Sequence, residues 1–151
     1  MRVTRYSDIG LRILMYLAHA QGRPTPVTAA EIATQYDVPL NHLVKVAGQL
    51  ARSGWINATR GRQGGLSLRA IPSALRIGAV LRELEGDAEL IDCESLGCQL
   101  RGNCVLRSAL AVGLSAFYHA MDAFTLADIA QGSTGEQIVE MHRNFARLSA
   151  H

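Results

Sequence analysis

Apolar residues recur at helical spacing along the first third of the chain and predict three helices, over residues 7–20, 29–36 and 40–52. The stripes that define the first and third helices are Ile9, Ile13, Leu14 and Leu17, and Leu43, Val46, Ala47 and Leu50. The second helix is expected to begin after Thr28, because the Thr28 hydroxyl and the Glu31 carboxylate have the spacing of a capping box. A short turn joins the second helix to the third, so the pair forms a helix-turn-helix.

Two short β-prone runs follow, at residues 55–59 and 66–69. The run Arg60-Gly61-Arg62-Gln63-Gly64-Gly65 between them predicts a hairpin tipped with arginines. A helix-turn-helix followed by such a hairpin is typical of a winged helix.

Three further helices are predicted in the rest of the chain, over residues 75–85, 105–123 and 135–148. The second of these is apolar along most of its length and therefore needs a partner to cover it. The last is expected to be capped by Ser133 or Thr134.

The predicted fold class is mainly α with a small β-hairpin wing: a winged helix-turn-helix followed by a long helix. The predicted division is a DNA-binding domain at residues 1–72, a connecting helix and cysteine loop at 73–104, and the long and C-terminal helices at 105–151.

Charge is distributed unevenly along the 151 residues, although the formal net charge is only +2. Residues 1–70 carry a net charge of +6 and residues 71–151 a net charge of −4. Only the first half is therefore suited to a polyanion such as DNA. No apolar run is long enough to cross a bilayer, and no signal-peptide core follows the first residues, so a cytoplasmic location is expected.

Candidate DNA contacts lie at the start of the third helix, because the second helix of a helix-turn-helix enters the major groove with its N-terminal residues towards the bases. These residues are Leu40, Asn41, His42 and Lys45. Asn41 can pair with an adenine edge, His42 can donate to a base or phosphate, and Lys45 can neutralise a phosphate or reach guanine.

The wing supplies a second set of candidate contacts. Arg60 and Arg62 are suited to a narrow minor groove, and the glycines beside them permit a close approach of the backbone. Gln63 in the same loop and Thr28 at the start of the helix-turn-helix complete the predicted DNA contacts.

The three cysteines, Cys93, Cys98 and Cys104, form a C-x4-C-x5-C pattern in a loop before the long helix. An odd count does not suit a closed disulfide framework, and polar neighbours disfavour inert buried thiols, so metal or redox chemistry is expected. Structural zinc prefers closer pairs, whereas iron-sulfur clusters are held mainly by thiolates.

A cubane cluster needs a fourth ligand that is not cysteine. The residues alone leave the choice open among Asp8, His19, Asp87, Asp92 and Glu94.

The whole pattern resembles the NsrR-type nitric-oxide-sensing repressors. The resemblance rests on Tyr6-Ser7-Asp8-Ile9-Gly10-Leu11-Arg12, on the arginine-tipped wing, and on the three-cysteine loop before a long helix, and it covers nearly the whole chain. It implies a homodimer paired through the long helices. In each subunit a 4Fe-4S cluster would be held by Cys93, Cys98 and Cys104 together with Asp8 of the other subunit.

The resemblance also implies a function. The cluster-loaded dimer would bind inverted-repeat operators of nitric-oxide detoxification genes and release them when nitric oxide nitrosylates the cluster. A 2Fe-2S cluster is the alternative form or a degradation product.

The nearest rival is a regulator of the same family that responds to iron or to iron-sulfur supply. Such relatives carry a histidine three residues after the third cysteine, where this chain has Arg107, and five residues between the first two cysteines, where this chain has four. A structural-zinc winged helix that binds proteins, and an electron carrier, are rivals from other classes.

The five histidines are scattered and form no catalytic constellation, so the chain is not expected to be an enzyme. They are His19, His42, His119, His142 and His151.

Overall fold

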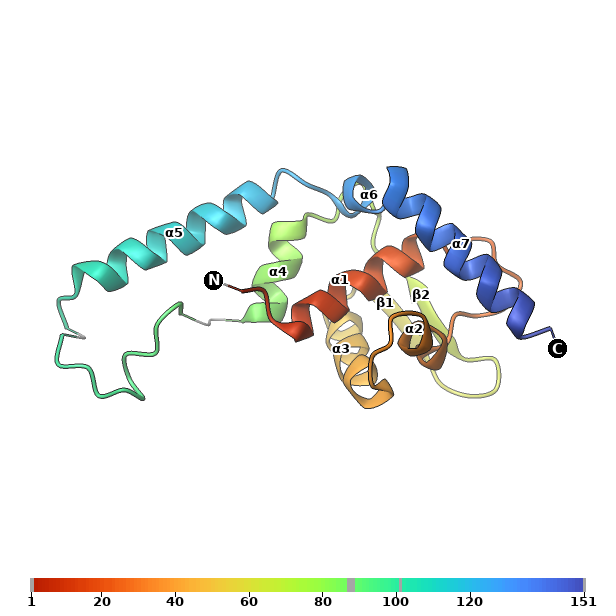
Figure 1. The fold of residues 1–151 in the computed structure, drawn as a ribbon, viewed down its shortest axis with the longest axis horizontal. Helices are drawn as coiled ribbons and strands as arrows, with labels where there is room; N and C mark the ends of the chain where they lie inside the picture. Colours follow the sequence, from red (N-terminus) through yellow and green to blue (C-terminus); the bar gives the residue numbers. More distant parts are fainter. Residues whose placement is uncertain (1, 87–88, 101, 151) are drawn as a thin grey trace.

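The computed structural model describes residues 2–86, 89–100 and 102–150. Helices dominate, and a single hairpin follows the third of them (Figure 1). In chain order the elements are α1 (Arg5–Ala18), α2 (Ala29–Gln35), α3 (Leu40–Arg52), β1 (Ile56–Thr59), β2 (Gly65–Leu68), α4 (Ile77–Glu85), α5 (Val105–Met121), α6 (Leu126–Ile129) and α7 (Gly132–Leu148).

The first five elements form a winged helix, as the sequence predicts. Strands β1 and β2 pair antiparallel, with Ile56 opposite Leu68 and Thr59 opposite Gly65. The apolar stripes of α1 and α3 face each other and are buried, because both helices pack into one core with α2 and α4. Leu126 of α6 and Ile138 of α7 complete this core, which holds α3 in place.

Capping residues explain where the first helices begin. Thr4 caps α1, because its Oγ1 accepts a hydrogen bond from the Ser7 amide at 3.2 Å, so α1 begins two residues earlier than expected. Thr28 caps α2 in the predicted way, with its Oγ1 accepting from the Glu31 amide at 3.0 Å. The other half of the expected capping box is wrong, because the Glu31 carboxylate accepts from Tyr16 and Arg23 instead.

The C-terminal region differs from the expectation at two points. A short helix, α6, lies in the stretch between two predicted helices where no element was predicted, and a reciprocal capping box between Thr125 and Asp128 starts it. Helix α7 begins at Gly132 after Gln131 and has no side-chain cap, so the expected cap at Ser133 or Thr134 is wrong. The expected cap is misplaced because α7 begins at Gly132, so Ser133 and Thr134 lie inside the helix.

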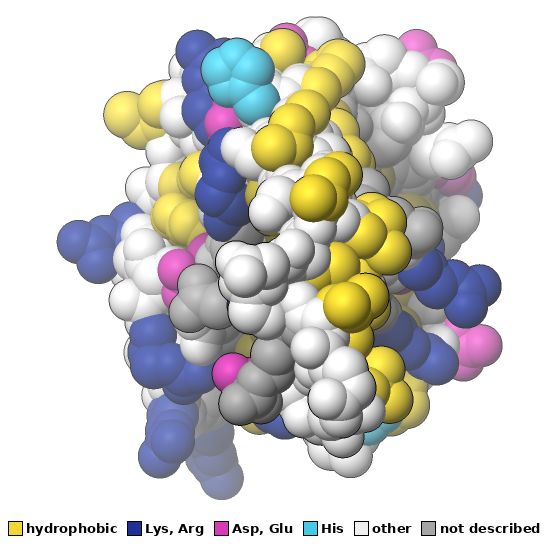
Figure 2. Space-filling view, turned by 90° about the vertical axis from the view of Figure 1, so that its left-hand side faces the viewer, with side chains coloured by type: hydrophobic (Ala, Val, Ile, Leu, Met, Phe, Trp, Pro, Cys, Tyr) yellow, Lys and Arg dark blue, Asp and Glu magenta, His cyan; other side chains and the backbone are white. Residues whose placement is uncertain are grey.

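Helix α5 extends away from the winged helix and none of its residues is buried (Figure 1). A band of apolar side chains runs along this end of the molecule (Figure 2). The large exposed apolar residues of the cysteine loop and α5 are Leu90, Leu96, Leu100, Val105, Leu106 and Val112. Among the described residues, no helix has both the length and the apolarity needed to cross a membrane.

Candidate DNA interface and metal centre

Helix α3 presents the predicted contact residues on its free side. Its other side is in the core, where the side chains of its apolar stripe are almost fully buried. Asn41, His42 and Lys45 are exposed, and Leu40 is 48% exposed beside them. The first turn of α3 therefore offers an amide, an imidazole and an ammonium group to a partner in solution.

Helix α1 holds α3 from the opposite side. It packs along α3, and the Tyr6 hydroxyl donates a hydrogen bond to the carbonyl of Lys45 at 3.5 Å. No side chain caps the N-terminus of α3, which follows Pro39. The positive end of the helix dipole there favours a phosphate.

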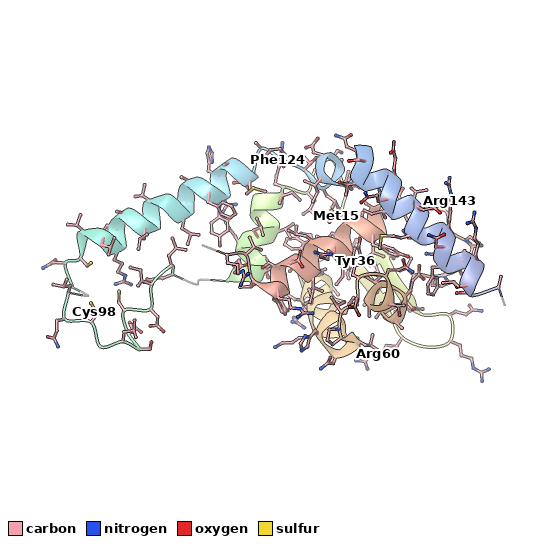
Figure 3. The ribbon with its side chains drawn as sticks, viewed as in Figure 1. Met15, Tyr36, Arg60, Cys98, Phe124 and Arg143 are labelled. Carbon is pink, nitrogen blue, oxygen red and sulfur yellow. The ribbon has the colours of Figure 1, made fainter. Side chains whose placement is uncertain are left out.

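The wing presents Arg60, Arg62 and Gln63, all of them exposed. Gly61 turns the loop with a φ of 105°, which a side chain would strain, and its carbonyl accepts from the Gly64 amide at 2.9 Å. The wing and α3 lie along the same lower edge of the molecule, where Arg60 is labelled (Figures 1 and 3).

The cations of this edge are available to an external anion. Within the described part of the chain, neither Lys45 nor the wing arginines form an ion pair. Thr28 is exposed at the start of α2, and its hydroxyl accepts the capping hydrogen bond while its own proton can still be donated to a phosphate.

The three cysteines lie on the loop between α4 and α5, and the labelled Cys98 is far from the wing (Figure 3). Cys93 is buried, whereas Cys98 and Cys104 are half-buried. The Cys98 amide donates to the Cys93 carbonyl at 3.2 Å, which folds the first part of the loop back on itself. Cys104 is the N-cap residue of α5.

Electrostatics link the three thiols. Burial raises the pKa of the Cys93 thiol, Cys98 raises it further, the Arg107 guanidinium lowers it, and Cys104 raises it again. The thiols thus lie close enough to influence one another, and three soft donors on one loop fit an iron-sulfur cluster or another thiophilic metal. No group of three possible ligands among the described residues forms a ready-made metal cage, so metal binding would have to draw the loop together.

The candidates for a fourth ligand are in different environments. Asp92 accepts from the Ser95 amide at 2.9 Å and from its hydroxyl at 2.6 Å, which lowers the pKa of Asp92. The Nε2 of His19 donates to the carbonyl of Ala130 at 2.5 Å, well away from the cysteine loop. Glu94 is exposed within the loop, and Asp87 lies outside the described residues.

Asp8 lies on the first turn of α1, and its carboxylate accepts from Nε of Arg12 at 2.9 and 3.0 Å. The side chain of Asp8 is 49% exposed, and it borders an open hollow with Arg12 and Tyr36. Within one subunit the structure does not bring Asp8 to the cysteine loop.

Arg107, at the position where related regulators carry a histidine, pairs with Glu89. The pair joins the first turns of α5 to the start of the cysteine loop, and the Arg107 guanidinium lowers the pKa of the Glu89 carboxyl. Arg107 therefore has a partner that its sequence position alone does not indicate.

The sequence does not predict the buried polar cluster around Glu31. Glu31 is almost fully buried and accepts hydrogen bonds from Tyr16 at 2.7 Å and from Arg23 at 2.5 Å, and His142 of α7 contacts both of these donors. Along the sequence, His142 is one of five scattered histidines. The only local signal was a carboxylate at capping-box spacing, and it indicated a different partner.

Comparisons with known proteins agree with this architecture. A family model described as an iron-dependent transcriptional regulator, Rrf2, matches residues 3–132. The HTH-type transcriptional repressor NsrR of Streptomyces coelicolor is 41% identical over 136 residues, which span 89% of this chain and 92% of that protein.

Two solved structures support the fold. CymR, the global cysteine regulator of Bacillus subtilis, matches with a TM-score of 0.66 at 24% identity over 86% of this chain and 96% of that one. T. potens IscR matches with a TM-score of 0.65 at 24% identity over 85% of each chain.

The fold and the relatives define a winged-helix regulator of transcription, not an enzyme. The chain belongs to the Rrf2 family, and within that family it is a transcriptional repressor of the NsrR type.

Proposed function

We propose that this chain is a nitric-oxide-sensing repressor that acts in the cytoplasm as a homodimer carrying a 4Fe-4S cluster in each subunit. In this proposal the loaded dimer binds inverted-repeat operators of nitric-oxide detoxification genes and leaves them when nitric oxide attacks the cluster. The observation that carries the proposal is the three-thiol loop, which directly precedes an uncovered apolar helix in a chain closely similar to a repressor of the NsrR type.

Dimerisation is proposed through α5. Val105 is 82% exposed, Leu106 61% and Val112 70%, and a continuous apolar surface of this kind favours association over exposure to water. A second copy of the chain is the proposed occupant, because an isologous pairing of two such helices covers both surfaces at once.

Cys93, Cys98 and Cys104 are the proposed thiolate ligands, and Asp8 of the partner subunit is the proposed fourth ligand. When bound, the cluster supplies thiolate-held iron that reacts with nitric oxide. An oxygen donor is a weaker partner for this iron than a thiolate, so the Asp8 ligand is the one most readily lost.

The environment of Asp8 suggests how loss of this ligand would affect α3, the proposed DNA-reading helix. A carboxylate bound to the partner's cluster would have to share or leave Arg12, and when released it could again accept from Nε of Arg12 with both oxygens. Both states act on the first turns of α1, which packs along α3. Ligation across the subunits would therefore bias the position of α3 in the major groove.

The proposal is tested by isolating the protein anaerobically and measuring iron, acid-labile sulfide and operator binding during a nitric-oxide titration. We expect about four iron and four sulfide per subunit, the composition of a 4Fe-4S cluster. Operator release is expected to follow the change in cluster absorbance. Zinc without sulfide would instead support a structural-zinc protein.

The alternative within the family is a regulator that responds to iron or to iron-sulfur supply. The description of the family as iron-dependent is consistent with this alternative. The two differ in the signal that removes the cluster. A cluster that is unaffected by nitric oxide at stoichiometric amounts but is lost on iron depletion would favour the rival.

Ligation by Asp8 in trans has its own test. A heterodimer of one Asp8→Ala chain and one Cys98→Ala chain keeps a complete cysteine set only on the Asp8→Ala chain. If the carboxylate acts across subunits, that heterodimer forms one cluster with its carboxylate ligand, and if it acts within a subunit, no cluster has one. An Asp8→Ala homodimer with unchanged spectrum, nitric-oxide reactivity and operator affinity would remove Asp8 from the site.

A further inference from the structure

The C-terminal helix α7 packs on the winged helix through its buried Ile138 and through His142. The His142 ring stacks on Tyr16 of α1, with ring centroids 3.9 Å apart and an interplanar angle of 26°. Its Nε2 is 3.0 Å from the Tyr16 carbonyl oxygen, and its Nδ1 is 2.8 Å from a terminal nitrogen of Arg23. Only 10% of the His142 side chain is exposed.

These two partners determine the protonation state of the ring. A guanidinium has only donors, so the Nδ1 of His142 accepts the hydrogen bond from Arg23. A carbonyl oxygen only accepts, so Nε2 carries the proton and donates it to Tyr16. The geometry therefore requires the neutral imidazole with its proton on Nε2, and protonation would turn Nδ1 into a donor that faces another donor.

Arg23 connects His142 to the helix-turn-helix. Its guanidinium donates to Oε1 of Glu31 at 2.5 Å, and the Tyr16 hydroxyl donates to the same oxygen at 2.7 Å. Glu31 lies in the first turn of α2, its side chain is 1% exposed, and α2 packs directly against α3. A continuous set of contacts thus runs from α7 through Arg23 and Glu31 to the helix that carries the predicted base contacts.

The family model ends at residue 132, where α7 begins. Nearly all of α7, including His142, therefore lies beyond the residues that the family model matches.

We propose that His142 is a positioning residue for DNA binding: its neutral ring fastens α7 to the helix-turn-helix, and its protonation in mild acid loosens that attachment and weakens operator binding. This inference rests on the proposed function, because it assumes that α3 reads DNA.

The groups around His142 set the direction of the pH dependence. Arg23 and His19 disfavour a charge on the ring, Glu31, whose carboxylate is 3.9 Å from Nδ1, favours it, and Tyr16 contributes its carbonyl. Burial is the largest influence and lowers the pKa of His142 below its usual value of about 6.5. The unfolded chain therefore takes up the proton first, so the stabilisation is complete above about pH 6.5 and is lost as the pH falls below it.

The test measures operator affinity at about pH 7.5 and about pH 5.0, the second well below an ordinary histidine pKa because burial lowers the pKa of His142. The probe is an inverted-repeat duplex selected from random-sequence DNA by the loaded wild-type protein, with cluster absorbance recorded in every sample. His142→Gln keeps an N–H donor for the Tyr16 carbonyl but cannot become charged, and His142→Ala removes both contacts. Arg143→Ala is the matched control, because Arg143 is the exposed neighbour on the same helix.

We expect wild type and Arg143→Ala to lose about fivefold or more in affinity between the two pH values, the lower end of typical coupling between sites. His142→Gln should bind as wild type does at the higher pH and change by less than about twofold at the lower, since the coupled proton is absent. His142→Ala should bind weakly at both. His42 is present in all four proteins, so its contribution to binding is common to them.

Two results would overturn this inference but not the proposed function. One is a His142→Gln protein that loses affinity in parallel with wild type, and the other is a His142→Ala protein that binds as wild type does. The glutamine variant keeps the test decisive if the alanine variant does not fold. A wild-type protein that selects no DNA at either pH would overturn the proposed function as well.

Discussion

Apolar side chains are buried in the winged helix but exposed in the arm, which is formed by the cysteine loop and α5. In the winged helix, apolar side chains such as Ile13, Leu14 and Leu50 are fully buried. In the arm, Val105 and Leu106 are mostly exposed, although they belong to an equally regular helix. The first region is a finished fold within one chain, whereas the second presents surface that only another molecule can cover.

The polar groups show the same contrast. The winged helix and α7 bury the Glu31 carboxylate among Tyr16, Arg23 and His142. The arm carries exposed pairs such as Arg107 with Glu89, which contribute little to stability in water. Removing one partner of the buried cluster leaves a charge uncompensated, so the two regions should respond very differently to substitution.

The largest expected effect is in the arm. Cys93→Ala, Cys98→Ala and Cys104→Ala should each abolish stable cluster binding and operator binding, because the loop offers no replacement thiolate. The winged helix should remain folded, because its core does not include the loop. Metal analysis and circular dichroism check the two statements, and a cysteine variant with a full iron and sulfide content would contradict the first.

A pair of leucine substitutions separates the two kinds of apolar surface. Leu50→Ala, in the core, should reduce the free energy of unfolding by about 2–5 kcal/mol. Leu106→Ala, on α5, should leave the secondary structure unchanged and shift the protein towards monomer. Denaturant unfolding and sedimentation measure these outcomes, and the contrast fails if Leu106→Ala has no effect on self-association.

Substitutions on the DNA side test which contacts carry sequence information. Asn41→Ala should lose discrimination at one base pair, worth about 1–3 kcal/mol. Lys45→Ala and Arg60→Ala should weaken binding to all sequences alike and reduce the salt dependence, because phosphate contacts release counterions. All three should keep the cluster spectrum. Wild-type binding by all three would show that α3 and the wing are misplaced as the DNA-reading elements.

The smallest expected effect is at the junction between the two regions. Thr125→Ala should destabilise the protein by about 0.5–2 kcal/mol, because Thr125 caps α6. Ser133→Ala should change stability by less than about 0.5 kcal/mol, because Ser133 is exposed and caps nothing. Thermal unfolding compares the stability of the two variants. An equal loss of stability would show that Ser133 does cap α7, as the sequence predicts.

Most of the winged helix could be predicted from the sequence because its signals are local. Helix α3 has the predicted bounds, since a turn precedes it and its apolar stripe faces one core. The hairpin was found from a run of glycines and arginines between two β-prone segments. Helix α6 was missed because four residues show too little periodicity, even though Thr125 and Asp128 carry the spacing of a capping box.

The candidate site divides in the same way. The three cysteines and the candidate contacts of α3 and the wing were identified from residue type, spacing and position, and the structure places the contact residues on an exposed edge. The fourth ligand could not be chosen, because spacing along the chain says nothing about which carboxylate comes near the loop. Within one subunit, Asp8 contacts Arg12 instead of the cysteine loop. Its proposed role is therefore to ligate the cluster of the other subunit.

The sequence by itself determined the order of the elements, the charge difference between the halves, and a thiol loop placed before an apolar helix. Tertiary structure alone decided that Glu31 is buried with Arg23, that His142 stacks on Tyr16, and that the first half of α5 is left exposed. The reason is the separation of the partners along the chain: His142 and the Tyr16 carbonyl are 126 positions apart. Helix periodicity and capping act within a few residues, whereas a buried hydrogen bond across the fold exists only after packing has excluded water from both partners.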